Sequence, residues 1–246
     1  MPDEPPLLHL GTAGWSLPRD SWPAFPAEGS HLERYARVFD AVEIDTSFYR
    51  PHQQKTYARW ADSTPPGFRF AVKLPRRITH DQALRDTAEP LDAFLAQARA
   101  LGDRLGCLLV QLAPSLVFDE ASVGDFLQML RRRHAGAVAL EPRHVSWFGA
   151  EADALLAAHR VARVLADPVL QAGGESPGGW PGLVYLRLHG SPRTYYSGYS
   201  ASILDALARR LRQARDEEVE CWCVFDNTAA GLAIPNALAL QARLAA

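Results

Sequence analysis

Short apolar runs recur along the whole chain at nearly even spacing, and this periodicity limits the available folds more than any other feature. Runs of strand length, rich in Leu, Val, Ile, Phe and Trp, begin near residues 7, 41, 68, 107, 137, 161, 183 and 221. Their mean spacing of about 31 residues matches one strand–helix unit of an eight-fold barrel of about 250 residues. The spacing therefore predicts an α/β fold, a single (β/α)8 TIM-type barrel that forms one domain over residues 1–246.

Helical patterns occupy all but one of the gaps between the runs. We predict helices over residues 32–39, 53–61, 90–105, 121–134, 150–159, 202–215 and 235–244. The remaining gap, residues 171–182, is too rich in Gly and Pro for a regular helix. We expect a loop there in place of the sixth helix, either a plain surface loop or a mobile lid.

Alternation within the runs separates an apolar face from a polar or charged one, because successive strand residues point to opposite faces. Val42 and Ile44 oppose Glu43 and Asp45, and the runs at 68–73, 137–141 and 183–189 divide in the same way. In the run that begins near 161, one parity holds Arg163, Leu165 and Asp167. We expect the apolar sets to face the helices and the other sets to point into the barrel. Charges there must pair with one another or face water.

Polar side chains end nearly every run, and in a barrel these ends meet at the face where active sites lie. The residues are Thr12, Glu43, Asp45, Lys73, Gln111, Glu141, Asp167, Arg187, His189, Asp226 and Asn227. A mixture of cations and carboxylates can shift the pKa of a side chain into a useful range for catalysis. The alternative is a ring of satisfied ion pairs that braces the barrel.

Seven segments, in order along the chain, resemble the YecE-like family, domain of unknown function 72. They are residues 11–16, 42–50, 68–73 with 78–80, 111–114, 141–144 with Trp147, 185–190 and 226–228. The resemblance implies a (β/α)8-type barrel in a bacterial family described as related to sugar isomerases, without an established reaction. This chain differs in having Asp45 and Asp226, where the family usually has Asn.

The strand-end residues favour an enzyme that works by acid–base chemistry of an isomerase or lyase type. Lys73 or Glu141 would be the base, His189 the acid or polarising group, and Arg187 would hold an anionic or carbonyl oxygen. His189 could equally be a core histidine hydrogen-bonded to a neighbour. The other class of function is a non-catalytic protein that binds a small anion or a nucleic-acid end.

Further residues at the strand ends and in the following loops are predicted to bind the substrate. They are Trp15, Glu43, Asp45, Tyr49, Gln111, Arg143, His144, Tyr196, Tyr199, Asp226 and Asn227. Aromatic rings can stack on a sugar or can simply pack over the barrel mouth. We expect a small sugar-like, phosphorylated or carboxylated ligand, with an anion preferred over a neutral sugar. That preference assumes that solvent or backbone N–H groups satisfy Asp45 and Asp226. A cationic side chain would then remain free to bind an oxyanion through two hydrogen bonds.

No metal site or cofactor is assigned. The acids and His189 could hold a divalent ion, but no compact ligand spacing supports one, and Lys73 and Arg187 compete for the same carboxylates. The glycines Gly11 and Gly14 do not form a dinucleotide fingerprint, because the third glycine is missing.

The overall charge argues against nucleic acid and membranes as partners. Lys plus Arg is 26 against 28 Asp plus Glu, a net charge of -2. The run Arg131–Arg133 ends a predicted helix, where cations complement the helix dipole. No signal peptide or membrane span is apparent, and Cys107, Cys221 and Cys223 are too few for a disulfide framework. We expect a cytoplasmic protein with buried, reduced thiols. The pattern assigns no oligomeric state.

Overall fold

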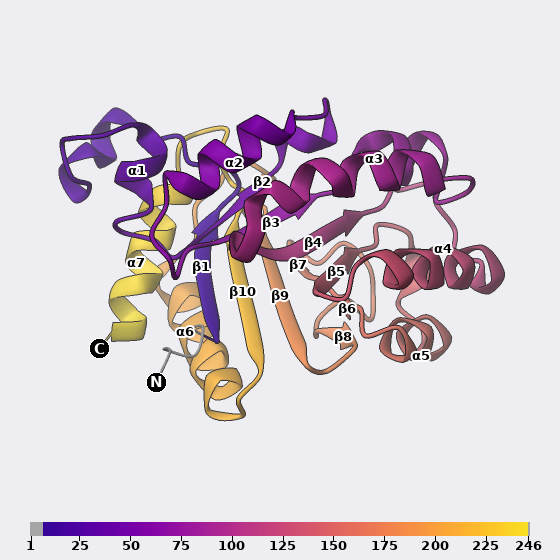
Figure 1. The fold of residues 1–246 in the computed structure, drawn as a ribbon. Helices are drawn as coiled ribbons and strands as arrows, with labels where there is room; N and C mark the ends of the chain where they lie inside the picture. Colours follow the sequence, from indigo (N-terminus) through magenta and orange to yellow (C-terminus); the bar gives the residue numbers. More distant parts are fainter. Residues whose placement is uncertain (1–6, 246) are drawn as a thin grey trace.

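A computed structural model describes residues 7–245, in which strands alternate with helices except between residues 162 and 188 (Figure 1). Residue 246 and residues 1–6, where a signal peptide would start, lie outside this described part. The strands are β1 (Leu8–Thr12), β2 (Ala41–Ile44), β3 (Arg69–Lys73), β4 (Leu105–Gln111), β5 (Ala137–Glu141), β6 (Ala162–Arg163), β7 (Leu165–Asp167), β8 (Gly178–Gly179), β9 (Leu183–Leu188) and β10 (Glu220–Phe225). The α-helices are α1 (His31–Tyr35), α2 (Gln54–Asp62), α3 (Ala88–Ala98), α4 (Glu120–Arg133), α5 (Ala150–Ala158), α6 (Ala201–Asp216) and α7 (Ala233–Ala245). Every predicted helix is present, and each predicted run contains a strand.

The strands pair into two largely parallel sheets. One sheet has the order β1-β10-β9-β7, and the other has the order β2-β3-β4-β5-β6-β8, in which only the β6–β8 pair is antiparallel. The α/β class with parallel strands is therefore confirmed. The hydrogen-bonded ladders do not form the single closed ring of eight strands that the spacing predicts.

The two sheets meet at two seams. At the first, an isolated parallel bridge joins Ala13, just after β1, to Glu43 in β2. Close approach there requires Gly11, since a Cβ at this position would lie 2.0 Å from the carbonyl oxygen of Ala41. At the second, β6 pairs with β5 and β7 pairs with β9, and Val164 links the two strands. The carboxyl ends of β2 and β9 thus come close although they belong to different sheets.

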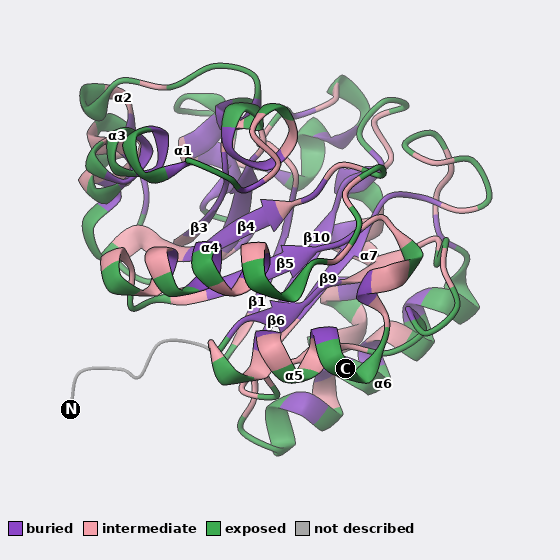
Figure 2. Cartoon of the chain, turned by 90° about the vertical axis from the view of Figure 1, so that its right-hand side faces the viewer, coloured by how far each residue is buried: buried purple, intermediate pink, exposed green. Residues whose placement is uncertain are grey.

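Two apolar clusters lie on the two sides of the strands. The larger packs the strands against the helices and includes Val42, Val72 and Leu186. The smaller lies between the sheets and includes Ala71, Tyr185, Trp222 and Val224. Figure 2 shows the buried strands and the exposed outer faces of the surrounding helices. The predicted assignment of faces is therefore correct for β2, β3, β5 and β9.

The run near residue 161 faces the opposite way to our prediction. Ala162 and Val164 belong to the inner cluster, whereas the Nε of Arg163 donates outward to Asp153 Oδ1 on α5 at 2.8 Å. Asp167 has the same parity as Arg163 and lines a hollow against α6. It is therefore not part of the ring of inward charges. The parity pattern alone did not reveal which set faced inward, because each set in this short run contains an apolar residue.

Helix α4 illustrates how local sequence determines an element. The side chain of Asp119 accepts from the backbone N–H of Ser122 at 2.9 Å, and this cap starts the helix. Its last turn carries the arginine run, of which Arg131 donates to the backbone carbonyls of His159, Arg160 and Gly136. Arg131 thus connects the end of α4 to the segment after α5 and to the residue before β5.

The segment between β7 and β9, all of it described, contains no helix and only the two-residue strand β8. The loop that replaces the sixth helix is as predicted. All three cysteines are free and buried. Among residues 7–245, no helix is both long and apolar enough to cross a membrane.

Candidate active site

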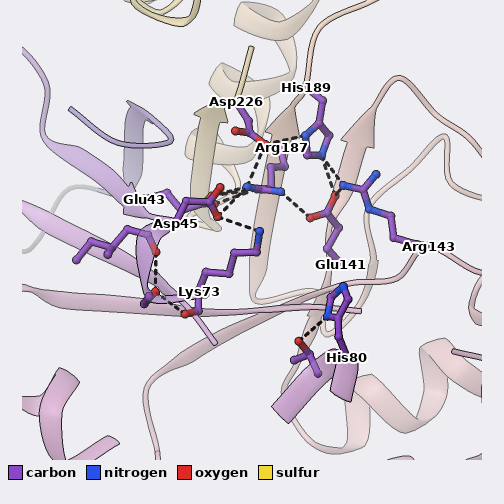
Figure 3. Close-up of polar contacts among 12 residues, drawn as sticks. Glu43, Asp45, Lys73, His80, Glu141, Arg143, Arg187, His189 and Asp226 are labelled. Atoms are coloured by element: carbon purple, nitrogen blue, oxygen red, sulfur yellow. Dashed lines mark hydrogen bonds and ion pairs between the residues drawn. The ribbon is translucent and has the colours of Figure 1, made fainter. Parts of the chain in front are cut away.

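The site is built around Arg187, which projects from β9 toward carboxylates from several other strands (Figure 3). Its Nη2 lies 2.7 Å from Glu43 Oε1, 3.0 Å from Asp226 Oδ2 and 3.3 Å from Asp45 Oδ1. Its Nη1 donates to Glu141 Oε2 at 3.1 Å, and its Nε donates to Glu43. One guanidinium group therefore holds four carboxylates, and every one of its nitrogens is occupied.

Glu43 is fully buried behind Arg187. The hydroxyl of Tyr185, two residues before Arg187 on the same face of β9, donates to Glu43 Oε2 at 2.7 Å. Burial raises the pKa of Glu43; Arg187 opposes this effect, and the nearby Asp45 adds to it. Glu43 is thus a buried residue at the base of the site and is not part of its exposed surface.

His189 lies between two carboxylates. Its Nε2 is 2.8 Å from Glu141 Oε1 and its Nδ1 is 2.9 Å from Asp226 Oδ2. Burial lowers the pKa of His189, but the two carboxylates outweigh burial and raise it overall. Each ring nitrogen of His189 thus lies within hydrogen-bonding distance of a carboxylate oxygen, and Arg143 Nη2 lies 3.0 Å from Nε2 as well. Glu141 Oε1 also accepts from Arg143 Nη2 at 2.7 Å.

The carboxylates on either side of His189 are strongly stabilised as anions. Burial acts to raise the pKa of Glu141, yet Arg187 and Arg143 together hold that pKa well below its usual value. For Asp226, burial is likewise outweighed by Arg187 and by the His189 hydrogen bond, so its pKa is lowered. Both oxygens of Glu141 have partners: Oε1 contacts His189 and Arg143, and Oε2 accepts from Arg187.

Lys73 and Asp45 form the outer part of the cluster. Lys73 Nζ lies 3.0 Å from Asp45 Oδ1 and 4.4 Å from the centre of the Phe48 ring. The Asp45 side chain is 29% exposed, against 1% for Arg187 and His189 and 0% for Glu141. Asp45 and Arg143, which is 14% exposed, are therefore the most accessible groups of the cluster, whereas Lys73 is 6% exposed and Asp226 8%.

The charged groups of this cluster pair with one another, which alters the expected ligand preference. Four carboxylates face Lys73, Arg143, Arg187 and His189, whose pKa they raise. The expectation that solvent or backbone would satisfy Asp45 and Asp226 is wrong, because both carboxylates contact Arg187. Arg187 is consequently not a free fork for an oxyanion.

A loop after β9 folds back beside His189. Gly190 has φ +95°, and a Cβ there would lie 2.6 Å from the Ser197 carbonyl oxygen, so only glycine fits this turn. The turn brings the Tyr195 ring edge-on to His189, with 5.7 Å between ring centroids. Tyr195 itself has φ +68°, an uncommon conformation for a bulky residue. This loop limits access to His189.

The structure brings some predicted site residues together and places others apart. Lys73, Glu141, Arg187, His189, Glu43, Asp45, Arg143 and Asp226 form the cluster. Gln111 pairs with Glu141 in the sheet register, and Trp15 lines a cleft that reaches Asp45.

The remaining predicted residues make other contacts. Tyr49 is 77% exposed and lines a separate hollow. His144 Nδ1 accepts from the Ser146 backbone, and the Tyr196 ring lies against Arg193. The hydroxyl of Tyr199 accepts from Gly190 N–H, and Asn227 donates to Ser197 and Asn236. These contacts position loops and do not involve the charged cluster.

Three contact residues were absent from the predicted site. Tyr185 has the inward parity of its strand, so its inward position was predictable from the sequence. We assigned only the neighbouring charged residues of that strand to the site. Phe48 and Tyr195 come from loops, whose direction a periodic pattern does not specify. Within residues 7–245, no group of three or more His, Cys, Asp or Glu side chains has an arrangement suited to a metal ion. The carboxylates of the charged cluster are already paired with lysine and arginine side chains.

Comparison with known proteins gives a consistent result. Residues 9–246 match the family described as "Protein of unknown function DUF72". The UPF0759 protein YecE of Escherichia coli K12 is 33% identical over 106 residues, which cover 43% of this chain and 38% of YecE. The UPF0759 protein YunF of Bacillus subtilis is 27% identical over 148 residues, 58% of this chain and 52% of YunF. The matched regions thus span about half or less of these relatives.

Solved structures resemble the chain over nearly its full length. A DUF72 family protein from Thermotoga maritima has a TM-score of 0.76 at 26% identity, with 97% of this chain and 99% of that one covered. One from Enterococcus faecalis has a TM-score of 0.78 at 21% identity and covers 97% of this chain and 96% of its own. The second likeness concerns the fold alone.

Proposed function

Because this chain belongs to the DUF72 family, whose description names no function, we propose a function from the site itself: acid–base catalysis on a small sugar-like substrate. The observation that carries the proposal is the pair of Asp45 and Lys73, a carboxylate and an ammonium 3.0 Å apart, in which Asp45 is 29% exposed and Lys73 is 6% exposed. A base and a proton donor side by side suit proton transfer between neighbouring substrate atoms.

In the proposed reaction, Asp45 removes a proton from a substrate carbon next to a carbonyl group. Lys73 donates a hydrogen bond to the carbonyl oxygen, where negative charge develops, and Arg143 supplies a second cationic donor. Asp45 then returns the proton to the former carbonyl carbon, while the proton of the adjacent hydroxyl group passes to the former carbonyl oxygen, so the reaction is an isomerisation with no net loss of atoms. Glu141, Arg187 and His189 act as positioning residues, because they are buried and their polar atoms are occupied.

We also infer that the two sheets act as one eight-stranded barrel. The Ala13–Glu43 bridge and the short link through Val164 support this, since they join the sheets on both sides. In such a barrel, Asp45 and Lys73 lie at the carboxyl ends of adjacent strands, where barrel enzymes have their active sites.

The test is solvent-deuterium exchange. Aldoses, ketoses and their phosphates are incubated in D₂O with the protein, and incorporation at the carbon next to the carbonyl group is followed by NMR. We expect incorporation with the parent protein and a fall of about 100- to 10,000-fold in Asp45→Asn, the usual contribution of a general base. Asp81→Asn, which removes an exposed carboxylate paired with Arg76, is the matched control and leaves the rate unchanged.

The same experiment separates an enzyme from a binding protein. If a sugar raises the melting temperature of the protein but no sugar takes up deuterium, the site binds without proton transfer and the proposal is rejected. Equal rates in Asp45→Asn and the parent would also reject it. Because the family resemblance places Asn at position 45 in most members, the substitution tests a feature particular to this chain.

A further inference from the structure

A cleft of about 490 Å³ opens beside Asp45. Its walls come from the segment after β1, the turn after β2, and α2, and its inner end is formed by Glu43 and Asp45. This volume falls within the usual range for small-molecule sites. The cleft is therefore large enough for a part of the substrate that extends away from the reacting atoms.

One wall of the cleft is aromatic. Trp15 and Trp60 meet edge to face with 5.0 Å between ring centroids, and His52 packs on Trp60 at 4.9 Å. His52 Nε2 is hydrogen-bonded to Thr46 Oγ1 at 2.7 Å, which holds the imidazole in place. Rings fixed in this way present an apolar surface against which the carbon-bound hydrogens of a sugar can pack.

The cleft is electrically polarised. Its inner end carries Glu43 and Asp45, and Arg50 is the single Arg or Lys among the described residues that line it. Arg50 is exposed, and its side chain makes no ion pair or hydrogen bond with any residue in the range 7–245. Burial and, after it, the Arg50 charge lower the pKa of His52. Arg50 is therefore an exposed cation whose donors are not used by any residue in the described part of the chain.

We propose that this cleft binds an anionic group of the substrate, a phosphate or a carboxylate, on Arg50, while the sugar chain packs against Trp15 and Trp60 and the reacting carbons reach Asp45. The inference rests on the proposed function and specifies its substrate class. It also places the anion where the structure leaves a cation available, since the nitrogens of Arg187 are occupied by carboxylates.

The test compares matched ligand pairs by calorimetry: aldose phosphates and aldonates, each against the parent neutral sugar, with inorganic phosphate as a further probe. We expect the phosphate or the carboxylate to increase affinity, and Arg50→Gln to weaken binding of the charged ligands by about 10- to 100-fold, as expected for a charged hydrogen bond. Neutral sugars should be unaffected. Arg50→Lys should retain part of the affinity, and Lys55→Gln, which removes an exposed charge outside the cleft, should retain all of it.

The outcomes separate this inference from the proposed function. If neutral sugars take up deuterium but charged ligands bind no better, the catalytic proposal stands and the anion subsite is rejected. Charged ligands that depend on Arg50 but never exchange deuterium leave the subsite standing and reject the catalysis. Equal losses in Arg50→Gln and Lys55→Gln would show a general charge effect and overturn the subsite.

Discussion

Replacing Arg187 with Met removes the cation on which four carboxylates converge. Met fills much of the same volume, so the main effect is electrostatic. Glu43 and Glu141 are 0% exposed and Asp226 is 8% exposed, so water cannot replace the lost donors. Breaking a buried ion pair from one side costs about 3 to 5 kcal/mol. For a chain of this size, that loss lowers the melting temperature by about 6 to 20 °C.

The loss in Arg187→Met should also depend on pH. In the parent protein the pKa values of Glu141 and Asp226 are lowered, so their stabilising effect is present above the unfolded-state pKa of about 4 and disappears as pH falls through the folded-state values. Without Arg187, burial raises these pKa values, and protonation relieves the buried charge at mildly acidic pH. The stability difference between parent and variant should therefore shrink from pH 8 to pH 5.

Urea denaturation at both pH values measures this difference. Arg163→Met is the matched control, because Arg163 is also buried but pairs only with Asp153, whose side chain is 32% exposed. That variant should lose about 1 to 2 kcal/mol, since water can solvate the remaining carboxylate. A loss below about 1 kcal/mol in Arg187→Met, the range of a surface pair, or a loss of equal size at pH 5 and pH 8, would refute the argument.

Two further predictions concern groups that hold the network together. His189 has a raised pKa, so its stabilising effect is complete below the unfolded-state pKa of about 6.5 and is lost as pH rises through the folded-state pKa. The difference in melting temperature between the parent and His189→Gln should therefore narrow from pH 6 to pH 9, and a constant difference would contradict this. Tyr185→Phe removes one donor to buried Glu43 and should cost about 1 to 2 kcal/mol in urea denaturation, whereas a neutral effect would mean that Arg187 alone satisfies Glu43.

The faces of the strands were largely predictable because alternation is a local property. Val42 and Ile44 had to share one face and Glu43 the other, whatever the rest of the chain did. The strand spacing likewise predicted the repeating units, and the Gly and Pro content of residues 171–182 predicted the missing sixth helix. Residues with the predicted inward parity, such as Lys73 and Arg187, therefore lie in one cluster.

The choice of partners within the cluster could not be read from the chain. Arg187 and Glu43 are separated by 144 positions, and their contact depends on how two sheets meet at the seam beside Gly11. Nothing local indicated that Asp226 would contact both Arg187 and His189. We expected Arg187 to be free to bind an anion, but in the assembled fold it is paired with carboxylates.

The sequence by itself determined the α/β repeat, the helices and the inward direction of most charged side chains, since these follow from spacing and alternation along neighbouring residues. Only the tertiary structure decided that Asp167 faces the helices, that Arg187 is saturated by carboxylates, and that Arg50 is left free at the edge of a cleft. The physical reason is that charge pairing depends on distances of about 3 Å between atoms from remote segments. Those distances are set by strand register and loop direction, which the packing of the whole chain determines.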